Sequence, residues 1–143
     1  MTRYVLDASV AAKWYLPPSD EPLSAEAASL LQQYAAGNCR LLVPDVFWIE
    51  AANTLWKSVQ RGKISRTASE TAIEALQRTQ IPTAPSLPLL REALQIAADY
   101  RRPVYDALYV ALAVASNAVL LTADERLANA LAARFPIRWL GAV

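Results

Sequence analysis

Four acidic residues occupy positions that a solvated surface charge explains poorly. Each follows a short apolar run or lies within an otherwise apolar segment; they are Asp7, Glu50, Asp106 and Asp124. Asp7 comes directly after Tyr-Val-Leu, and Asp124 follows Val-Leu-Leu-Thr-Ala. In open parallel sheets, ligand sites form beyond the carboxyl ends of the strands, so acids that follow two such strands can share one crevice. We therefore treat the four carboxylates as a candidate active site.

Each acid also has a purely structural explanation. Asp7 can cap a helix that follows it, and Asp106 can gain from the dipole of a helix whose first turn it occupies. Thr122 and Glu125 fit a capping box, which leaves Asp124 favoured only by a helix dipole. Glu50 can lie on the solvent-exposed side of the helix that contains it. The hypothesis of an active site therefore rests on the joint position of the four acids.

Carboxylates that converge on one site need a cation or protons. Two like charges about 4 Å apart repel by roughly 4 kcal/mol at an effective dielectric constant near 20. The repulsion raises their pKa values or recruits a cation. Oxygen-only ligands suit a hard divalent ion, Mg²⁺ or Mn²⁺. One or two such ions can activate water and neutralise the departing oxygen in phosphodiester hydrolysis.

The residues that the chain lacks exclude other kinds of catalysis. Its 143 residues include no histidine and one cysteine, Cys39, which excludes imidazole bases, zinc cages and intrachain disulfides. Three glycines are too few for a glycine-rich phosphate loop. The net charge of +1 neither favours nor excludes a polyanionic substrate. If the protein is an enzyme, carboxylates must carry its chemistry.

Polar and basic residues flank the acids. Ser9 and Thr122 each lie two residues from an aspartate, and Asn53 lies about one helical turn beyond the glutamate. They can support metal-binding carboxylates or act as turn and cap residues. Lys13 and Arg126 lie near the predicted mouth of the site and are candidate phosphate contacts.

Short apolar strands alternate with helices along the chain. The predicted strands cover residues 3–6, 41–43, 81–84, 118–121 and 137–140, the third at a sheet edge because prolines flank it. The predicted helices cover residues 9–16, 21–36, 46–60, 65–80, 87–100, 104–117 and 123–134. This alternation implies parallel pairing through helical crossovers, and hence an α/β sandwich in one domain over residues 1–143. With no membrane-length apolar run and no signal-peptide pattern, we expect a cytoplasmic protein.

The order of four segments resembles the PIN-domain family. The segments YVLDAS, VFWIEAANTLWK, YDALYVALA and LLTADERL carry the four acids, and the resemblance spans residues 3–140. The most similar members are the VapC-type ribonuclease toxins of type II toxin–antitoxin pairs. The resemblance implies a three-layer α/β/α sandwich around a parallel sheet of four to five strands.

The resemblance also implies a function. Asp7, Glu50, Asp106 and Asp124 correspond to acids that bind Mg²⁺ or Mn²⁺ and cleave RNA. The family further implies a homodimer and a cognate antitoxin whose extended tail covers the acidic groove. Two other classes stay open: a non-catalytic module that binds RNA or protein, and a metal-dependent phosphodiesterase acting on DNA or small phosphate esters.

Tryptophan is a residue type enriched at protein interfaces. We expect Trp14, Trp48 and Trp56 to lie near one apolar groove that takes the antitoxin. The alternative is that these side chains fill the core of the domain itself.

Overall fold

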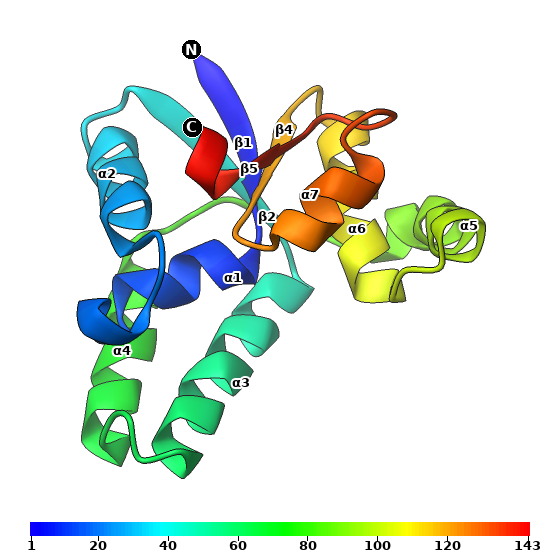
Figure 1. Ribbon diagram of the computed structural model, residues 1–143. Coiled ribbons are helices and arrows are strands. Elements are labelled where there is room, and N and C mark those ends of the chain that lie inside the picture. Colours follow the sequence, from blue (N-terminus) through cyan, green and yellow to red (C-terminus); the bar gives the residue numbers. More distant parts are fainter.

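A five-stranded parallel sheet forms the centre of the computed structural model, which describes residues 1–143 (Figure 1). The strands are β1 (Thr2–Leu6), β2 (Cys39–Pro44), β3 (Thr83–Ala84), β4 (Val119–Thr122) and β5 (Ile137–Trp139). They lie in the order β3-β2-β1-β4-β5, and every neighbouring pair is parallel. The predicted α/β class, the five strands and the edge position of the third are confirmed.

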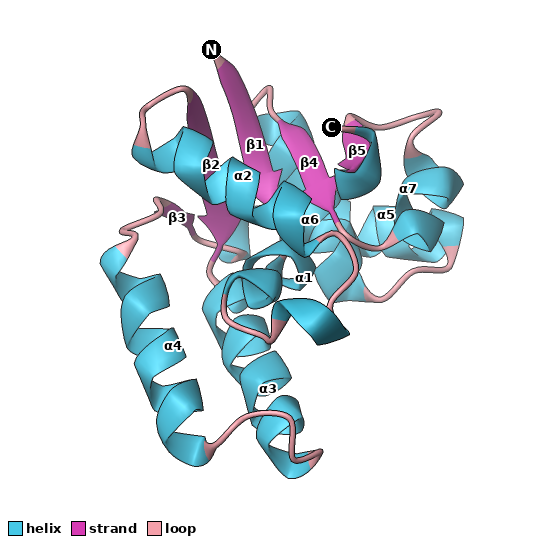
Figure 2. Ribbon diagram, turned by 60° about the vertical axis from the view of Figure 1, so that its left-hand side comes forward, coloured by secondary structure: helices cyan, strands magenta, loops and turns pink.

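Helices provide the crossovers that parallel strands require, and they lie around the sheet (Figure 2). They are α1 (Ala8–Ala11), α2 (Ser24–Ala35), α3 (Val46–Gln60), α4 (Arg66–Arg78), α5 (Leu90–Tyr100), α6 (Val104–Ala115) and α7 (Glu125–Leu131). Helix α2 packs on β2 from one face, while α6 packs on β1, β2 and β4 from the other and contacts α5. This arrangement is the predicted three-layer α/β/α sandwich. All seven helices fall short of the length and apolarity that a bilayer span needs.

Helix α6 is the helix most deeply enclosed in the core. Seven consecutive residues, Ala107 to Ala113, are buried. A helix that is apolar on every side must be covered on every side, and here the sheet and α5 cover it. Asp106 lies directly before this run, in the first turn of α6. The packing of α6 therefore holds Asp106 at the border between the core and the carboxyl edge of the sheet.

Helices α3 and α4 form a pair that extends away from the sheet (Figure 1). Helix α3 covers the predicted residues 46–60, and the chain then turns at Gly62, whose φ of +72° favours glycine. Ser65 caps α4 by accepting a hydrogen bond from the backbone N–H of Ala68 at 3.0 Å. The start of α3 at the end of β2 brings Glu50 beside the strand ends.

Prolines shorten three of the predicted helices. The helix predicted over residues 9–16 is a four-residue α1 followed by a 3₁₀ turn at Ala12–Trp14, before Pro17. The helix predicted over residues 21–36 starts only at Ser24, because Pro22 holds Glu21 in extended backbone (φ −116°, ψ 115°). The first turn predicted for residues 87–100 is likewise 3₁₀, with Pro88 inside it.

Candidate active site

The four predicted acids line one cavity of about 710 Å³. Asp7 follows β1, Glu50 lies in α3, Asp106 begins α6, and Asp124 follows β4. Ser9 and Asn53, which the sequence predicted as accessory polar residues, also line the cavity. Six further lining residues were not predicted: Ala8, Val46, Ile49, Thr54, Lys57 and Tyr105. The carboxyl edge of the parallel sheet therefore holds a single acidic cleft.

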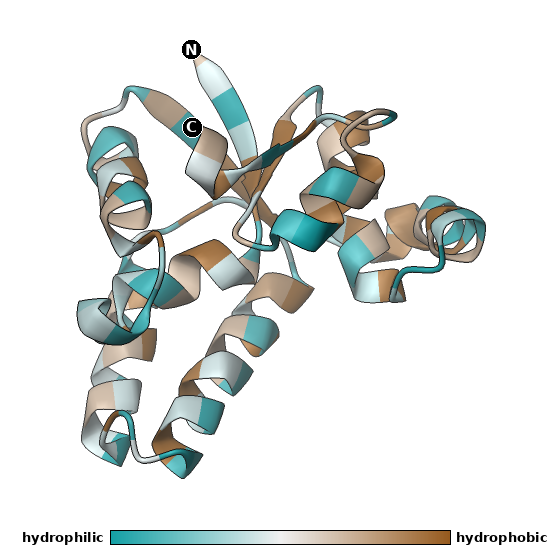
Figure 3. Cartoon of the chain, viewed as in Figure 1, coloured by the Kyte–Doolittle hydropathy of each residue, from teal (hydrophilic) through white to brown (hydrophobic).

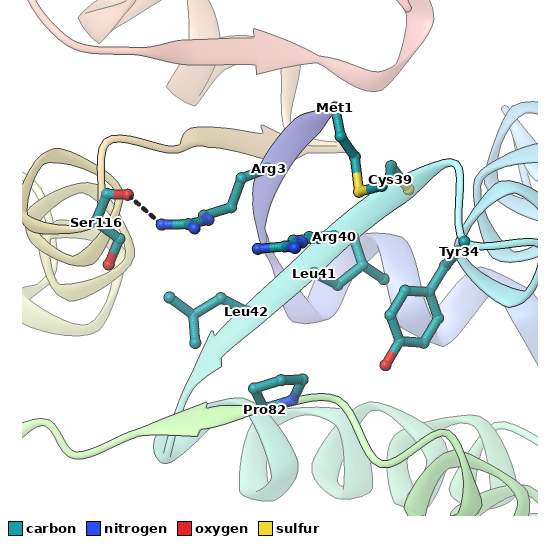
Figure 4. Close-up of a pocket in the computed structure, with 10 residues that line it drawn as sticks. Met1, Arg3, Tyr34, Cys39, Arg40, Leu41, Leu42, Pro82 and Ser116 are labelled. Atoms are coloured by element: carbon teal, nitrogen blue, oxygen red, sulfur yellow. Dashed lines mark hydrogen bonds between the residues drawn. The ribbon is translucent and has the colours of Figure 1, made fainter.

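The opposite edge of the sheet has a contrasting character. A cavity of about 590 Å³ lies there, where β1 and β2 begin, and Figure 4 shows Arg3 and Arg40 side by side in it. Arg3 donates a hydrogen bond to the carbonyl of Ser116 at the end of α6, at 3.0 Å. No carboxylate lines this cavity, in contrast to the acidic cleft at the other edge.

Asp7 is the most firmly held of the four acids. Its Oδ2 accepts hydrogen bonds from Thr122 Oγ1 at 2.7 Å and from Ser9 Oγ at 3.0 Å. The side chain also caps α1, so the cap role and the place in the cleft hold together. Burial raises the pKa of Asp7, the hydrogen bonds from Thr122 and Ser9 oppose this rise, and the charge of Asp124 adds to it. The hydroxyls fix the carboxylate in one orientation.

Thr122 and Asp124 have different roles from those of the predicted capping box. Thr122 is fully buried, and its hydroxyl both donates to Asp7 and accepts from the backbone N–H of Asp124 at 3.0 Å. The N-cap of α7 is Asp124, whose Oδ1 accepts from the N–H groups of Arg126 and Leu127 at 3.0 and 3.2 Å. The capping box was therefore wrong, because Asp124 directly precedes the first helical residue.

Glu50 lies half-buried among like charges. Burial raises its pKa to about 7, the charges of Asp7 and Asp106 add to the rise, and the neighbouring Tyr109 hydroxyl opposes it. Its Oε1 is buried without a hydrogen-bond partner. Asn53 lines the same cavity one turn along α3, as predicted. A carboxylate in this setting gains from any cation that enters the cleft.

Arg102 bridges two of the acids, and sequence reasoning missed it. Its Nη2 lies 3.5 Å from Asp106 Oδ2 and 4.0 Å from Asp124 Oδ2. Burial and the charge of Asp7 raise the pKa of Asp106, and the Arg102 guanidinium opposes the rise. The available signal was the spacing of four residues between Arg102 and Asp106. This pair was missed because residues 101–103 were interpreted only as the break between two predicted helices.

Neither Lys13 nor Arg126, the two predicted phosphate contacts, lines the acidic cavity. The side chain of Lys13 is buried, its Nζ lies 3.4 Å from Glu21 Oε1, and it lines a separate cavity. The 3₁₀ turn after α1 carries Lys13 away from Asp7. Arg126 lies at the start of α7 with its side chain exposed. Lys57 is the basic residue that lines the acidic cavity, and it lies two turns beyond Glu50 on α3.

The predicted single apolar groove around three tryptophans is also wrong. Trp14 lines the Lys13 cavity and donates to the carbonyl of Ala27 at 2.8 Å. Trp48 lines another cavity, beside Ile73 of α4, and donates to Thr83 Oγ1 at 3.0 Å. Trp56 lies exposed on α3 and lines neither. Trp14 lies where the 3₁₀ turn Ala12–Trp14 contacts α2, and Trp48 lies on α3, which contacts α4, so the side chains are apart.

The donor set of the cleft fits a hard divalent cation in its chemistry. All four side chains are carboxylates, one buried oxygen is unpartnered, and burial and neighbouring charges raise the pKa values of Asp7, Glu50 and Asp106. No three of the acids stand close enough to hold an ion together. Mg²⁺ commonly takes one or two carboxylates and keeps several waters, so fewer direct protein ligands suffice.

Comparison with known proteins places the chain in a family. Residues 4–131 match the family model of the PIN domain. The chain is 31% identical over 129 residues to Ribonuclease VapC3 of Pyrobaculum aerophilum, covering 89% of this chain and 93% of that protein. It is 35% identical over 98 residues to Ribonuclease VapC9 of Mycobacterium tuberculosis, covering 68% of this chain and 76% of that protein. The chain belongs to the PIN-domain family. Within that family, its resemblance to the VapC type is confirmed.

Solved structures support the same fold. PAE2754 from Pyrobaculum aerophilum matches with a TM-score of 0.71 and 24% identity, covering 98% of this chain and 85% of that chain. VapBC2 from Rickettsia felis, bound to a DNA fragment from its promoter, matches with a TM-score of 0.66 and 12% identity, covering 96% and 98%. At these identities the similarity establishes the PIN-type fold.

Proposed function

We propose that this protein is a divalent-metal-dependent endoribonuclease and the toxin of a toxin–antitoxin pair. The observation that carries the proposal is the cavity lined by Asp7, Glu50, Asp106 and Asp124, in a chain that has no histidine. The ribonuclease names of the VapC relatives support RNA as the substrate. The acids are the catalytic and metal-binding residues of the proposal, with Mg²⁺ or Mn²⁺ as the ion.

The chain's own residues would prepare the cleft for phosphodiester hydrolysis. A bound divalent ion supplies a Lewis acid that makes water a better nucleophile and offsets charge on the departing oxygen. Thr122 and Ser9 would keep Asp7, one of the residues that would hold the ion, in one orientation by their hydrogen bonds to Oδ2. Glu50 has a pKa of about 7 in the metal-free cleft, so it would release its proton when a cation binds beside it.

The rim of the cleft offers groups that suit an RNA backbone. Lys57 adds a positive charge, Asn53 an amide, and Tyr105 an exposed aromatic ring. An ammonium can contact a phosphate, and a base can stack on an aromatic ring of this kind. We assign substrate positioning to this rim, with Arg126 beside it at the start of α7, and give Lys13 no part in it.

A substrate panel tests the proposal. Purified protein should cleave single-stranded RNA in Mg²⁺ or Mn²⁺, cleave single-stranded DNA and bis(p-nitrophenyl) phosphate much less, and cleave nothing in EDTA. Gel and absorbance assays at equal protein concentration measure this. Equal cleavage of DNA would instead support the general phosphodiesterase. RNA binding without cleavage in any divalent ion would support the non-catalytic module.

We also propose a cognate antitoxin, a homodimer and a cytoplasmic location; the similar VapBC2 structure supports the antitoxin. For the antitoxin, the surface of α3 beside α4 is the best candidate. A cavity of about 520 Å³ there is lined by Trp48, Ile49, Ala52 and Ile73. Ile49 also lines the acidic cavity. An extended antitoxin segment on α3 could therefore reach the carboxylates as well.

Truncation of Ile49 tests this surface. Ile49 is 74% exposed, so Ile49→Ala should leave the fold intact. It should weaken antitoxin binding by about tenfold, the loss expected when an interface anchor worth roughly 1.4 kcal/mol is removed. Calorimetry with the purified antitoxin measures the affinity. The matched control is Leu94→Ala on α5, where the leucine is 61% exposed. Equal affinities for wild type and both variants would remove the proposed surface.

A further inference from the structure

Tyr109 is a buried polar residue in the most apolar helix of the protein. It lies in α6, three residues after Asp106, and is 1% exposed. Its hydroxyl is buried and has no hydrogen-bond partner. Phenylalanine would pack equally well at this position without that penalty, because buried polar groups are nearly always hydrogen-bonded. The hydroxyl therefore calls for an explanation other than packing.

The second unpartnered atom belongs to the acidic cavity. Glu50 Oε1, on α3, is also buried without a partner, and Glu50 lines that cavity together with Asp106, which lies three residues before Tyr109 on α6. The Tyr109 hydroxyl also opposes the rise in the pKa of Glu50. A phenol can donate one hydrogen bond, and an ionised carboxylate can only accept. One bond from Tyr109 Oη to Glu50 Oε1 would satisfy both atoms. Burial and the nearby charges of Asp7 and Glu50 raise the pKa of Tyr109 far above its usual range, so the hydroxyl keeps its proton.

We propose that Tyr109 is a positioning residue, which donates a hydrogen bond to Glu50 Oε1 and directs the other carboxylate oxygen into the acidic cavity. The inference rests on the proposed metal-dependent function, because it concerns how Glu50 meets a cation there. Glu50 is the acid on α3, whereas the aspartates lie at the ends of β1 and β4 and at the start of α6. Tyr109 would thus connect α6 to α3 across the cleft and fix the position of the Glu50 carboxylate.

This role differs from the support that the other acids receive. Asp7 is held by two hydroxyls, Asp124 by two backbone N–H groups, and Asp106 by Arg102. Glu50 has no side-chain donor other than the Tyr109 hydroxyl among the groups that act on it. A partner of a metal-binding carboxylate typically contributes about 10- to 100-fold in metal affinity or activity. We expect an effect of that size from this single hydroxyl.

Mn²⁺ titration of metal-stripped protein tests the proposal without relying on catalysis. Tyr109→Phe should weaken the Kd for Mn²⁺, measured by calorimetry, by about 10-fold or more. In the Glu50→Gln background the same substitution should have no further effect, because the partner carboxylate is gone. With RNA as substrate, the variant should lose kcat at nearly unchanged KM.

Tyr34→Phe is the matched control. Its hydroxyl is partly buried, donates to the carbonyl of Thr79 at 3.1 Å, and lies at the opposite edge of the sheet (Figure 4). Removing it should lower the melting temperature but leave the Kd for Mn²⁺ unchanged. Tyr109→Phe should show the reverse pattern: a metal-free melting temperature at least equal to that of wild type, with a weaker Kd.

The other outcomes are equally informative. An unchanged Kd in Tyr109→Phe, or an equal loss in the Glu50→Gln background, would overturn the positioning role. A lower melting temperature with unchanged Kd would assign the hydroxyl to stability alone and overturn it too. A wild-type protein that binds no Mn²⁺ would instead refute the proposed metal-dependent function, and this inference with it.

Discussion

Asp7→Asn should reduce RNA cleavage by more than about 100-fold, since even an outer partner of a metal ligand contributes up to that factor. The substitution removes the charge that a cation needs. It also replaces a pure acceptor with a group that is half donor. Thr122 and Ser9 both donate to Asp7 Oδ2, so an amide nitrogen at that place would face two donors. Expression in cells should no longer arrest growth, and new RNA 5′ ends, mapped by sequencing, should disappear.

Asp99→Asn controls for the loss of one negative charge. Asp99 is exposed near the end of α5 and lines none of the four cavities described above. This variant should cleave RNA and arrest growth as the wild type does. Equal growth arrest and equal 5′ ends from Asp7→Asn and wild type, at matched protein levels, would contradict the nuclease mechanism.

Local patterns were sufficient to find the acids and most of the elements. Helix α3 covers the residues predicted from its start after Pro44 and its end before Gly62. The strand ends predicted for Asp7 and Asp124 are correct because short apolar runs bounded by polar residues are strong strand signals. That the four acids line one cavity follows from the parallel sheet, whose carboxyl ends face the same way.

Contacts between distant segments could not be predicted in this way. The bond from Thr122 to Asp7 joins residues 115 positions apart, and the sequence favoured a local capping role for this threonine. Tyr109 was not singled out within the segment YDALYVALA, because no local pattern relates its hydroxyl to Glu50, 59 positions earlier. The prediction that Lys13 lies at the mouth of the site was wrong for a local reason, since a 3₁₀ turn replaced the expected α-helix.

The lysine shows why helix type matters at a site. A 3₁₀ turn advances with three residues per turn instead of 3.6, so residue positions rotate away from those of a regular α-helix. The prolines at positions 17, 18 and 22 make such turns frequent after α1. Distance along the chain from Asp7 was therefore a poor guide to position, whereas Lys57, on a long regular helix, does reach the cleft.

The metal-free protein should lose stability as the pH rises from about 5 to 8, and a divalent ion should restore it. The folded-state pKa of Glu50 is about 7, against an ordinary value of 4.5. Between these values the folded state binds more protons than the unfolded state, so the free energy of unfolding falls as the pH rises. The stabilising contribution is fully present below about pH 4.5 and is lost as the pH rises toward 7. Raised pKa values of Asp7 and Asp106 act in the same direction.

Melting curves in EDTA and in Mn²⁺ across this pH range measure both effects. Mn²⁺ binds ionised carboxylates, and a ligand stabilises the folded state by RT ln(1 + [L]/Kd), so tighter binding gives more stabilisation at a fixed Mn²⁺ concentration. Its effect on the melting temperature should therefore be larger at pH 8 than at pH 5. Glu50→Gln removes the main titrating group, so its metal-free melting temperature should fall less steeply with pH than that of wild type. Parallel pH profiles for the two proteins would show that Glu50 does not hold its proton in the fold, and the effect of burial and like charges inferred for Glu50 would then be wrong.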